Sequence, residues 1–124
     1  MKKLQAEEVE LVGARLSGDK MNVDAKICAR IDWLLNNALE IFGYGEESGG
    51  WDKLYRDPAD GRFWLLTYPF SEMHGGGPPT LRNLALSEDD ARARYLSPEE
   101  WHKRMETFMR DRNIRYISPD ENEP

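Results

Sequence analysis

The chain has 124 residues, of which 40% are hydrophobic and 32% charged, and 17 Lys and Arg against 23 Asp and Glu give it a net charge of −6. This length fits one domain with a packed core. The acidic balance argues against nucleic acid as a direct ligand, because proteins that bind phosphate backbones gather Lys and Arg, and it suits a basic protein partner. A single cysteine, Cys28, and the lack of an apolar run of membrane-spanning length favour a soluble cytoplasmic protein without a membrane partner.

The first third of the chain predicts a β-hairpin followed by a long helix. Val9 to Leu16 is apolar enough for a strand, Gly18-Asp19 is a turn signal, and Met21 to Val23 is expected to be the returning strand. Asp24 then caps a helix that Gly43 ends. Its apolar positions recur at steps of three and four residues: Ile27, Ile31, Leu34, Leu35, Ala38, Leu39 and Ile41.

The middle of the chain predicts an exposed glycine-rich connector and a second hairpin. The connector is GYGEESGG at 43–50, and the hairpin strands at 51–56 and 62–68 flank a loop at 57–61 that contains Asp, Pro and Gly. The strand at 62–68 carries apolar side chains on both faces. It is therefore expected to be a central strand covered on both sides, or a strand with one face against a partner.

The last third predicts a strand at 80–86 and two helices. Ser87 with Asp90 opens a short helix that ends at Tyr95, and Ser97-Pro98-Glu99-Glu100 opens another that runs to about Arg112. A short strand at 114–117 and a frayed polar tail at 118–124 are expected to follow. The pattern predicts the α+β class: one domain over 1–124, with an antiparallel sheet of about four to five strands, one long helix packed on it, and two C-terminal helices.

Residues 68–79, YPFSEMHGGGPP, hold the most unusual composition in the chain. His74 followed by three glycines has the form of the oxyanion-hole loop of some esterases, but none of the serines lies in the Gly-x-Ser-x-Gly frame that such chemistry needs. An alternative function remains open from these residues. It is a small hydrolase or anion-binding enzyme that uses Ser71, Glu72, His74 and the amides of Gly75, Gly76 and Gly77.

Other constellations of reactive residues are incomplete. Glu72 with His74, or His102 with Glu106, could supply two metal ligands, but no further Cys or His completes a shell, so neither a metal nor a cofactor is expected. Cys28 is expected to be a small buried hydrophobe. What remains is a hairpin dense in Trp, Tyr and Arg, the residue types that dominate protein-binding hot spots, although its large aromatics are equally suited to a core.

The order of several motifs in the chain resembles the immunity protein 27 family, which is found beside bacterial polymorphic and contact-dependent toxins. The motifs are LVG, ARIDWLL, GGWDKLYRDPADGRFWLLTYPFSEMHGGGPPTL and ARARY. The resemblance extends over about residues 8–95, with 97–117 as a C-terminal extension. It implies an α+β immunity protein without catalytic activity or cofactor, which binds a cognate toxin domain stoichiometrically and blocks it.

The hypothesis of a toxin inhibitor gives two groups of candidate residues. Those for contact with the toxin are Trp51, Tyr55, Arg62, Trp64, Ser71, Glu72 and His74, and those that shape the loop are Gly75, Gly76, Gly77 and Pro78. Glu72 would pair with a basic toxin residue. In the competing interpretation these residues hold the fold: Arg62 pairs internally with Asp60 or Glu72, and the glycine loop is a corner where backbone packs tightly.

Overall fold

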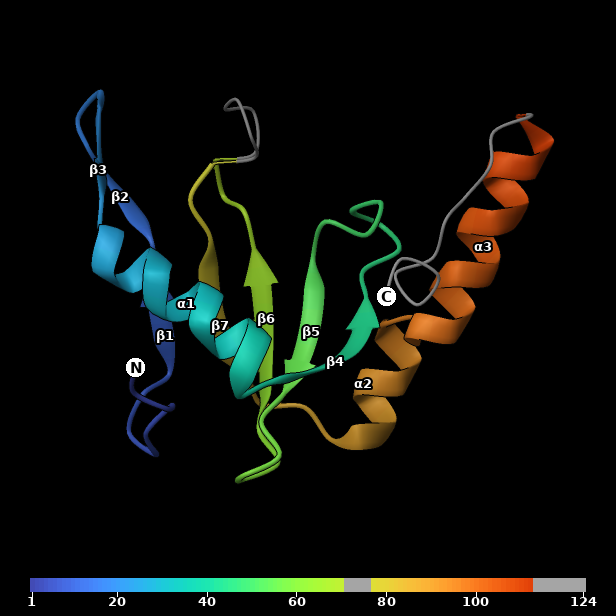
Figure 1. Ribbon diagram of the computed structural model, residues 1–124, viewed down its shortest axis with the longest axis horizontal. Helices are drawn as coiled ribbons and strands as arrows, with labels where there is room; N and C mark the ends of the chain where they lie inside the picture. Colours follow the sequence, from blue (N-terminus) through green and yellow to red (C-terminus); the bar gives the residue numbers. More distant parts are fainter. Residues whose placement is uncertain (71–76, 113–124) are drawn as a thin grey trace.

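The structure is a computed structural model that describes residues 1–70 and 77–112 (Figure 1). Within these residues it has the α+β fold that the sequence predicts, with a five-stranded antiparallel sheet, a separate two-stranded hairpin and three helices. The predicted strand at 114–117 lies outside the described residues. In chain order the elements are β1 (Glu10–Val12), β2 (Ala14–Ser17), β3 (Lys20–Val23), α1 (Ala25–Asn37), β4 (Glu40–Tyr44), β5 (Lys53–Arg56), β6 (Phe63–Thr67), β7 (Thr80–Leu84), α2 (Glu88–Arg94) and α3 (Pro98–Asp111).

The sheet has the order β1-β7-β6-β5-β4, so that β6 is its central strand. Alternation along β6 sends Trp64 and Leu66 toward one face and Phe63 and Leu65 toward the other, and all four are buried. The apolar run on both faces of β6 therefore reflects a strand covered on both sides.

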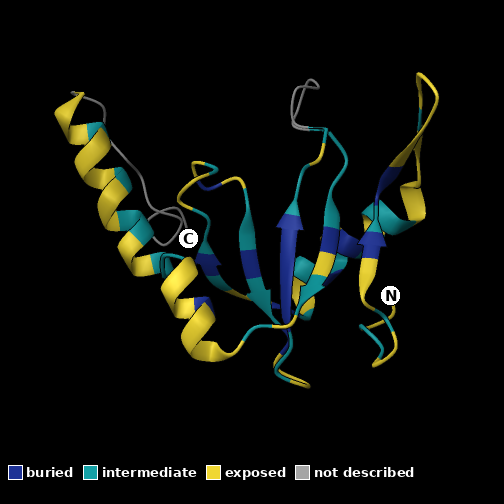
Figure 2. Cartoon of the chain, turned by 180° about the vertical axis from the view of Figure 1, so that it is seen from behind, coloured by how far each residue is buried: buried dark blue, intermediate teal, exposed yellow. Residues whose placement is uncertain are grey.

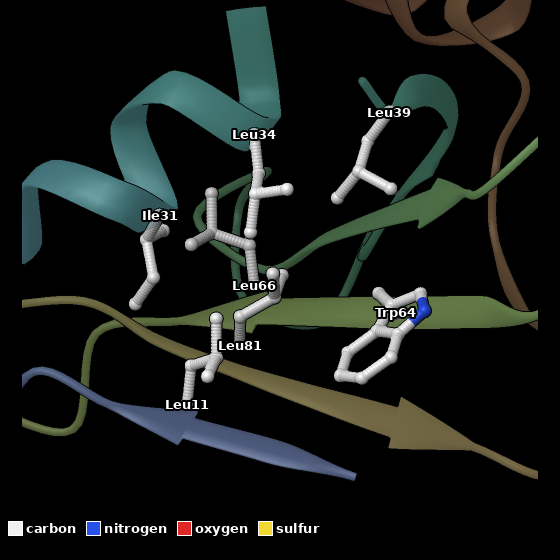
Figure 3. Close-up of a cluster of buried hydrophobic side chains, with 7 residues drawn as sticks. All are labelled: Leu11, Ile31, Leu34, Leu39, Trp64, Leu66 and Leu81. Atoms are coloured by element: carbon white, nitrogen blue, oxygen red, sulfur yellow. The ribbon is translucent and has the colours of Figure 1, made fainter. Parts of the chain in front are cut away.

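One face of the sheet is covered by α1, and we call it the α1 face. The helix begins where the carboxylate of Asp24 accepts hydrogen bonds from the backbone N–H groups of Lys26 and Ile27, both at 3.1 Å. Ile31 and Leu34 on α1 are fully buried against the sheet. Figure 3 shows the cluster that they form with the other members of this core, which are Leu11, Leu39, Trp64, Leu66 and Leu81.

The opposite face of the sheet is covered in part by α2, and we call it the α2 face. Ala91 of α2 is buried against Phe63 and its neighbours on this face. Ser87 caps α2 and Ser97 caps α3, as their positions in the sequence predict. The last helix, α3, contacts the edge strand β4, and none of its residues is buried, so it stands beside the sheet with much of its surface exposed (Figures 1 and 2).

The predicted end of the long helix at Gly43 is wrong. The helix ends at Asn37, Leu39 turns into the core, and the residues up to Tyr44 form the edge strand β4. Gly43 lies inside this strand, where a Cβ atom would come within 2.7 Å of the Cβ of Tyr95. Its lack of a side chain thus allows the backbone after α2 to lie against β4, and it does not cap a helix.

The predicted first strand is in fact two short strands. The chain leaves the main sheet at Gly13, so that β1 pairs with β7 while β2 pairs with β3. The N–H of Gly13 donates to the carbonyl of Pro79 at 2.9 Å, and its own carbonyl accepts from the N–H of Asp24 at 2.8 Å. This close backbone packing leaves no room for a side chain at Gly13. The nearby Cys28 is only half-buried, and not enclosed as predicted.

Candidate protein-binding surface

Aromatic side chains gather around β4, β5 and the start of α3, beside the core that α1 covers. We define this aromatic surface by Tyr44, Trp51, Lys53, Tyr55, Tyr68 and Trp101. Cross-strand pairing places Tyr44 opposite Lys53, and places Lys53 and Tyr55 opposite the α1-face residues Leu66 and Trp64. The six residues come from four separate segments of the chain, which only the fold brings together.

Trp51 is the most exposed member of the aromatic surface. The residue remains 54% exposed, although its ring packs edge-on against Tyr68 with 5.6 Å between centroids. It follows Gly49 and Gly50, whose φ angles of 68° and 88° are conformations that glycine adopts easily. The predicted connector at 43–50 is therefore partly a strand and partly a turn that holds Trp51 in place.

Trp101 joins α3 to this surface. Its ring stacks on Tyr44, with centroids 5.5 Å apart and planes inclined by 13°. The same ring lies against the backbone of Gly50, where a Cβ atom would overlap it. The carboxylate of Glu46 also accepts a hydrogen bond from Arg104 of α3 at 2.5 Å. These contacts fix the start of α3 beside Trp51.

Tyr55 and Tyr68 keep their protons at neutral pH. Burial raises the pKa of Tyr55 to about 12, and the neighbouring Tyr44 and Tyr68 add to the shift. Burial also raises the pKa of Tyr68, and the carboxylate of Asp32 adds to that shift. Both hydroxyls are thus neutral groups that can donate a hydrogen bond. The ammonium of Lys53 lies 5.9 Å from the centre of the Tyr44 ring.

Arg62 is used inside the fold. Its guanidinium donates to the carboxylate of Asp60 at 2.7 Å and to the carbonyls of Gln5 and Glu8 at 2.9 and 2.8 Å, and it lies 4.9 Å from the Trp64 ring centre. Asp60 is one of the two internal partners, Asp60 or Glu72, that the structural interpretation of the sequence predicts for Arg62. Arg62 therefore ties the N-terminal segment to the turn between β5 and β6.

Trp64 is fully buried in the α1-face core, so its predicted contact with a partner is replaced by a structural role. Figure 3 shows its indole among the aliphatic side chains of that core. Its Nε1 is buried without a hydrogen-bond partner. An unpaired buried donor lowers stability, so the contribution of this ring to the fold comes from its volume and apolar area.

Most of the glycine loop lies outside the described residues. This holds for Ser71, Glu72, His74, Gly75 and Gly76, on which the alternative enzyme hypothesis depends. The structure describes the end of the loop, where Gly77 has a φ angle of 75° and a Cβ atom would lie 2.6 Å from the carbonyl oxygen of Phe70. Gly77, followed by Pro78, thus closes a corner where backbone packs on backbone, as the structural interpretation predicts.

The aromatic surface offers aromatic rings, phenol hydroxyls and one ammonium, which suit binding by apolar contact and hydrogen bonds. The described residues hold no group of three or more His, Cys, Asp or Glu side chains that could bind a metal ion. No helix among them is long and apolar enough to cross a membrane. Of the residues in this surface, the sequence interpretation named Trp51 and Tyr55 as candidate contacts. It missed Tyr44, Lys53, Tyr68 and Trp101, which it assigned to a connector, two strands and a helix without a site.

Comparison with known proteins gives a match to a family model. The model of the family described as immunity protein 27 matches residues 16–85, more than half of the chain. No curated protein and no solved structure matches. The matched range contains every member of the aromatic surface except Trp101, and it ends before α2 and α3 begin. The chain therefore belongs to the immunity protein 27 family.

Proposed function

We propose that this immunity protein binds a cognate bacterial toxin domain stoichiometrically and neutralises it by covering the toxin's active site or substrate channel. In this proposal the chain converts no substrate and needs no cofactor. Family membership supports the immunity role. The observation that carries the binding mode is the exposure of Trp51, a large aromatic side chain held at the surface by Tyr68 and a glycine turn.

Exposed tryptophans with fixed surroundings have the properties of binding hot spots. Trp and Tyr bring a large contact area with few rotatable bonds, so little conformational entropy is lost when a partner covers them. In the aromatic surface, Trp51 is positioned before any partner arrives. We therefore assign Trp51 as the central contact of the interface, with Tyr55 and Tyr68 as half-buried neighbours that support it.

The charge of the chain supports a basic partner. The chain has 23 acidic and 17 basic residues, which gives it a net charge of −6. Such a field attracts a basic protein surface and raises the rate of encounter. The proposal places the inhibitor in the cytoplasm, where an unpaired cysteine such as Cys28 is common.

The test is co-expression with the toxin encoded beside this chain. We expect the wild-type chain to restore growth and to elute with the toxin domain as a one-to-one complex in gel filtration. Trp51→Ala should weaken binding at least about 30-fold, the effect of losing a hot-spot residue. Phe108→Ala is the matched control, because this aromatic is 42% exposed on α3 outside the aromatic surface. If the wild-type chain neither protects cells nor forms a complex, the proposal is wrong.

A further inference from the structure

A small hollow lies beside Trp51 on the aromatic surface. It is lined by Gly49, Gly50, Trp51, Lys53 and Tyr68. A Cβ atom on Gly49 would have no neighbour within 4 Å, so that side of the hollow is open to an incoming group. Two aromatic residues and a glycine turn thus line the hollow together with one charged residue, Lys53.

Within residues 1–70 and 77–112, Lys53 forms no ion pair with a carboxylate. Its sequence neighbour Asp52 lines a different hollow together with Arg94 and Tyr95. The carboxylate of Glu46 is already paired with Arg104. Among the described residues, no carboxylate oxygen lies within 4.0 Å of the Lys53 ammonium, whose contact is with the Tyr44 ring.

We infer that a carboxylate side chain of the toxin domain enters this hollow and forms an ion pair with Lys53. The inference rests on the proposed function and names the chemistry of a polar contact beside Trp51. A carboxylate has several acceptor positions, and the Lys53 ammonium and Tyr68 hydroxyl are both donors. Trp51 and Tyr68 would exclude water from the pair, and an ion pair shielded from water is stronger than an exposed one.

Lys53 would then determine specificity and register. The inhibitor as a whole is acidic, so its general attraction is toward basic surfaces. A positive group at the centre of the aromatic surface selects, among such surfaces, one that carries an acidic residue at the matching position. A toxin with Lys or Arg at that position would leave two like charges facing each other, which opposes binding.

The experiment measures binding of the purified toxin domain to variants of the full chain. Lys53→Met keeps most of the aliphatic stem and removes the charge, and we expect it to weaken binding at least about 30-fold, mainly through faster dissociation. Lys53→Glu should weaken it further. Lys20→Met is the matched control in the β2–β3 hairpin, which is exposed and distant from the hollow in sequence, and it should leave affinity within about twofold.

A charge exchange keeps the test independent of folding. Asp and Glu residues of the toxin surface are changed singly to Lys, and one of these variants should bind Lys53→Glu more tightly than it binds the wild-type chain. If Lys53→Met binds like the wild type while Trp51→Ala does not, the inference is wrong and the proposed function stands. If no toxin substitution rescues Lys53→Glu, the inference is likewise overturned. If the wild-type chain itself fails to bind, both fall together.

Discussion

Glu8→Gln tests how the N-terminal segment is held against the domain. Both oxygens of Glu8 accept hydrogen bonds from the guanidinium of Arg30 on α1, each at 2.7 Å, and one also accepts from the N–H of Gln5 at 2.8 Å. Arg30 donates in addition to the carbonyls of Lys2 and Lys3. The substitution removes the negative charge from the centre of this network and leaves its shape almost unchanged.

The pKa of Glu8 gives the size of the effect. The hydrogen bonds from Arg30 outweigh burial and, with the N–H of Gln5, lower this pKa from 4.5 to about 2. If the whole shift appeared in the free energy of unfolding, it would contribute about 3 kcal/mol. The side chains of Arg30 and Glu8 remain 18% and 21% exposed, so water screens their charges in part. We therefore expect Glu8→Gln to lower the free energy of unfolding by about half of this value, ~1.5 kcal/mol.

The sign of the pH dependence follows from the direction of the shift. A lowered folded-state pKa means that the ion pair stabilises the fold fully above pH 4.5 and that this contribution is lost as the pH falls toward 2. Urea unfolding should therefore show Glu8→Gln to be less stable than the wild type at neutral pH and nearly equal to it near pH 2. Glu99→Gln, in an exposed pair with Lys103, is the matched control and should change stability by less than about 0.5 kcal/mol. Equal stability of Glu8→Gln and the wild type at neutral pH would refute this reasoning.

Two further predictions concern the core and the aromatic surface. Trp64→Phe should lower the free energy of unfolding by ~1 to 2 kcal/mol, and Trp64→Ala by ~3 to 5 kcal/mol, as measured by thermal unfolding. The Phe variant loses less because it keeps an aromatic ring and removes an indole N–H without a partner. Equal losses in the two variants would contradict the role assigned to the ring. Gly50→Ala should move Trp101 off Tyr44 and reduce the near-ultraviolet circular dichroism of the stacked rings, because the new methyl group overlaps the Trp101 ring. Gly49→Ala is its control, since it shares a positive φ angle but meets no neighbour; a similar spectral change in both variants would show that backbone strain alone is responsible.

The sequence predicts those elements that begin with a local signal. Asp24, Ser87 and Ser97 each cap the helix that the pattern assigns to them, because the capping hydrogen bonds involve only neighbours in the chain. The end of α1 is different. Leu39 and Ile41 continue the helical spacing, and only the pairing of β4 with β5 draws this segment into an extended conformation.

The aromatic surface depends on contacts that are distant in the sequence. Trp51 could be named as a candidate from its place in a hairpin dense in Trp, Tyr and Arg, but Tyr68 and Trp101, which complete the surface, come from later segments. The difference between Trp51 and Trp64 also follows from topology: Trp64 lies on the central strand beneath α1, whereas Trp51 precedes β5 at the end of a turn. Composition alone gives the two tryptophans the same role.

The most direct test of the central claim is a titration of the toxin domain's activity with the purified immunity protein. The account predicts that activity falls linearly with added chain and is abolished at one chain per toxin domain. Undiminished toxin activity with the chain in excess would contradict inhibition by binding. Loss of activity at far fewer than one chain per toxin would show turnover, and with it an enzyme where this account has a binding protein.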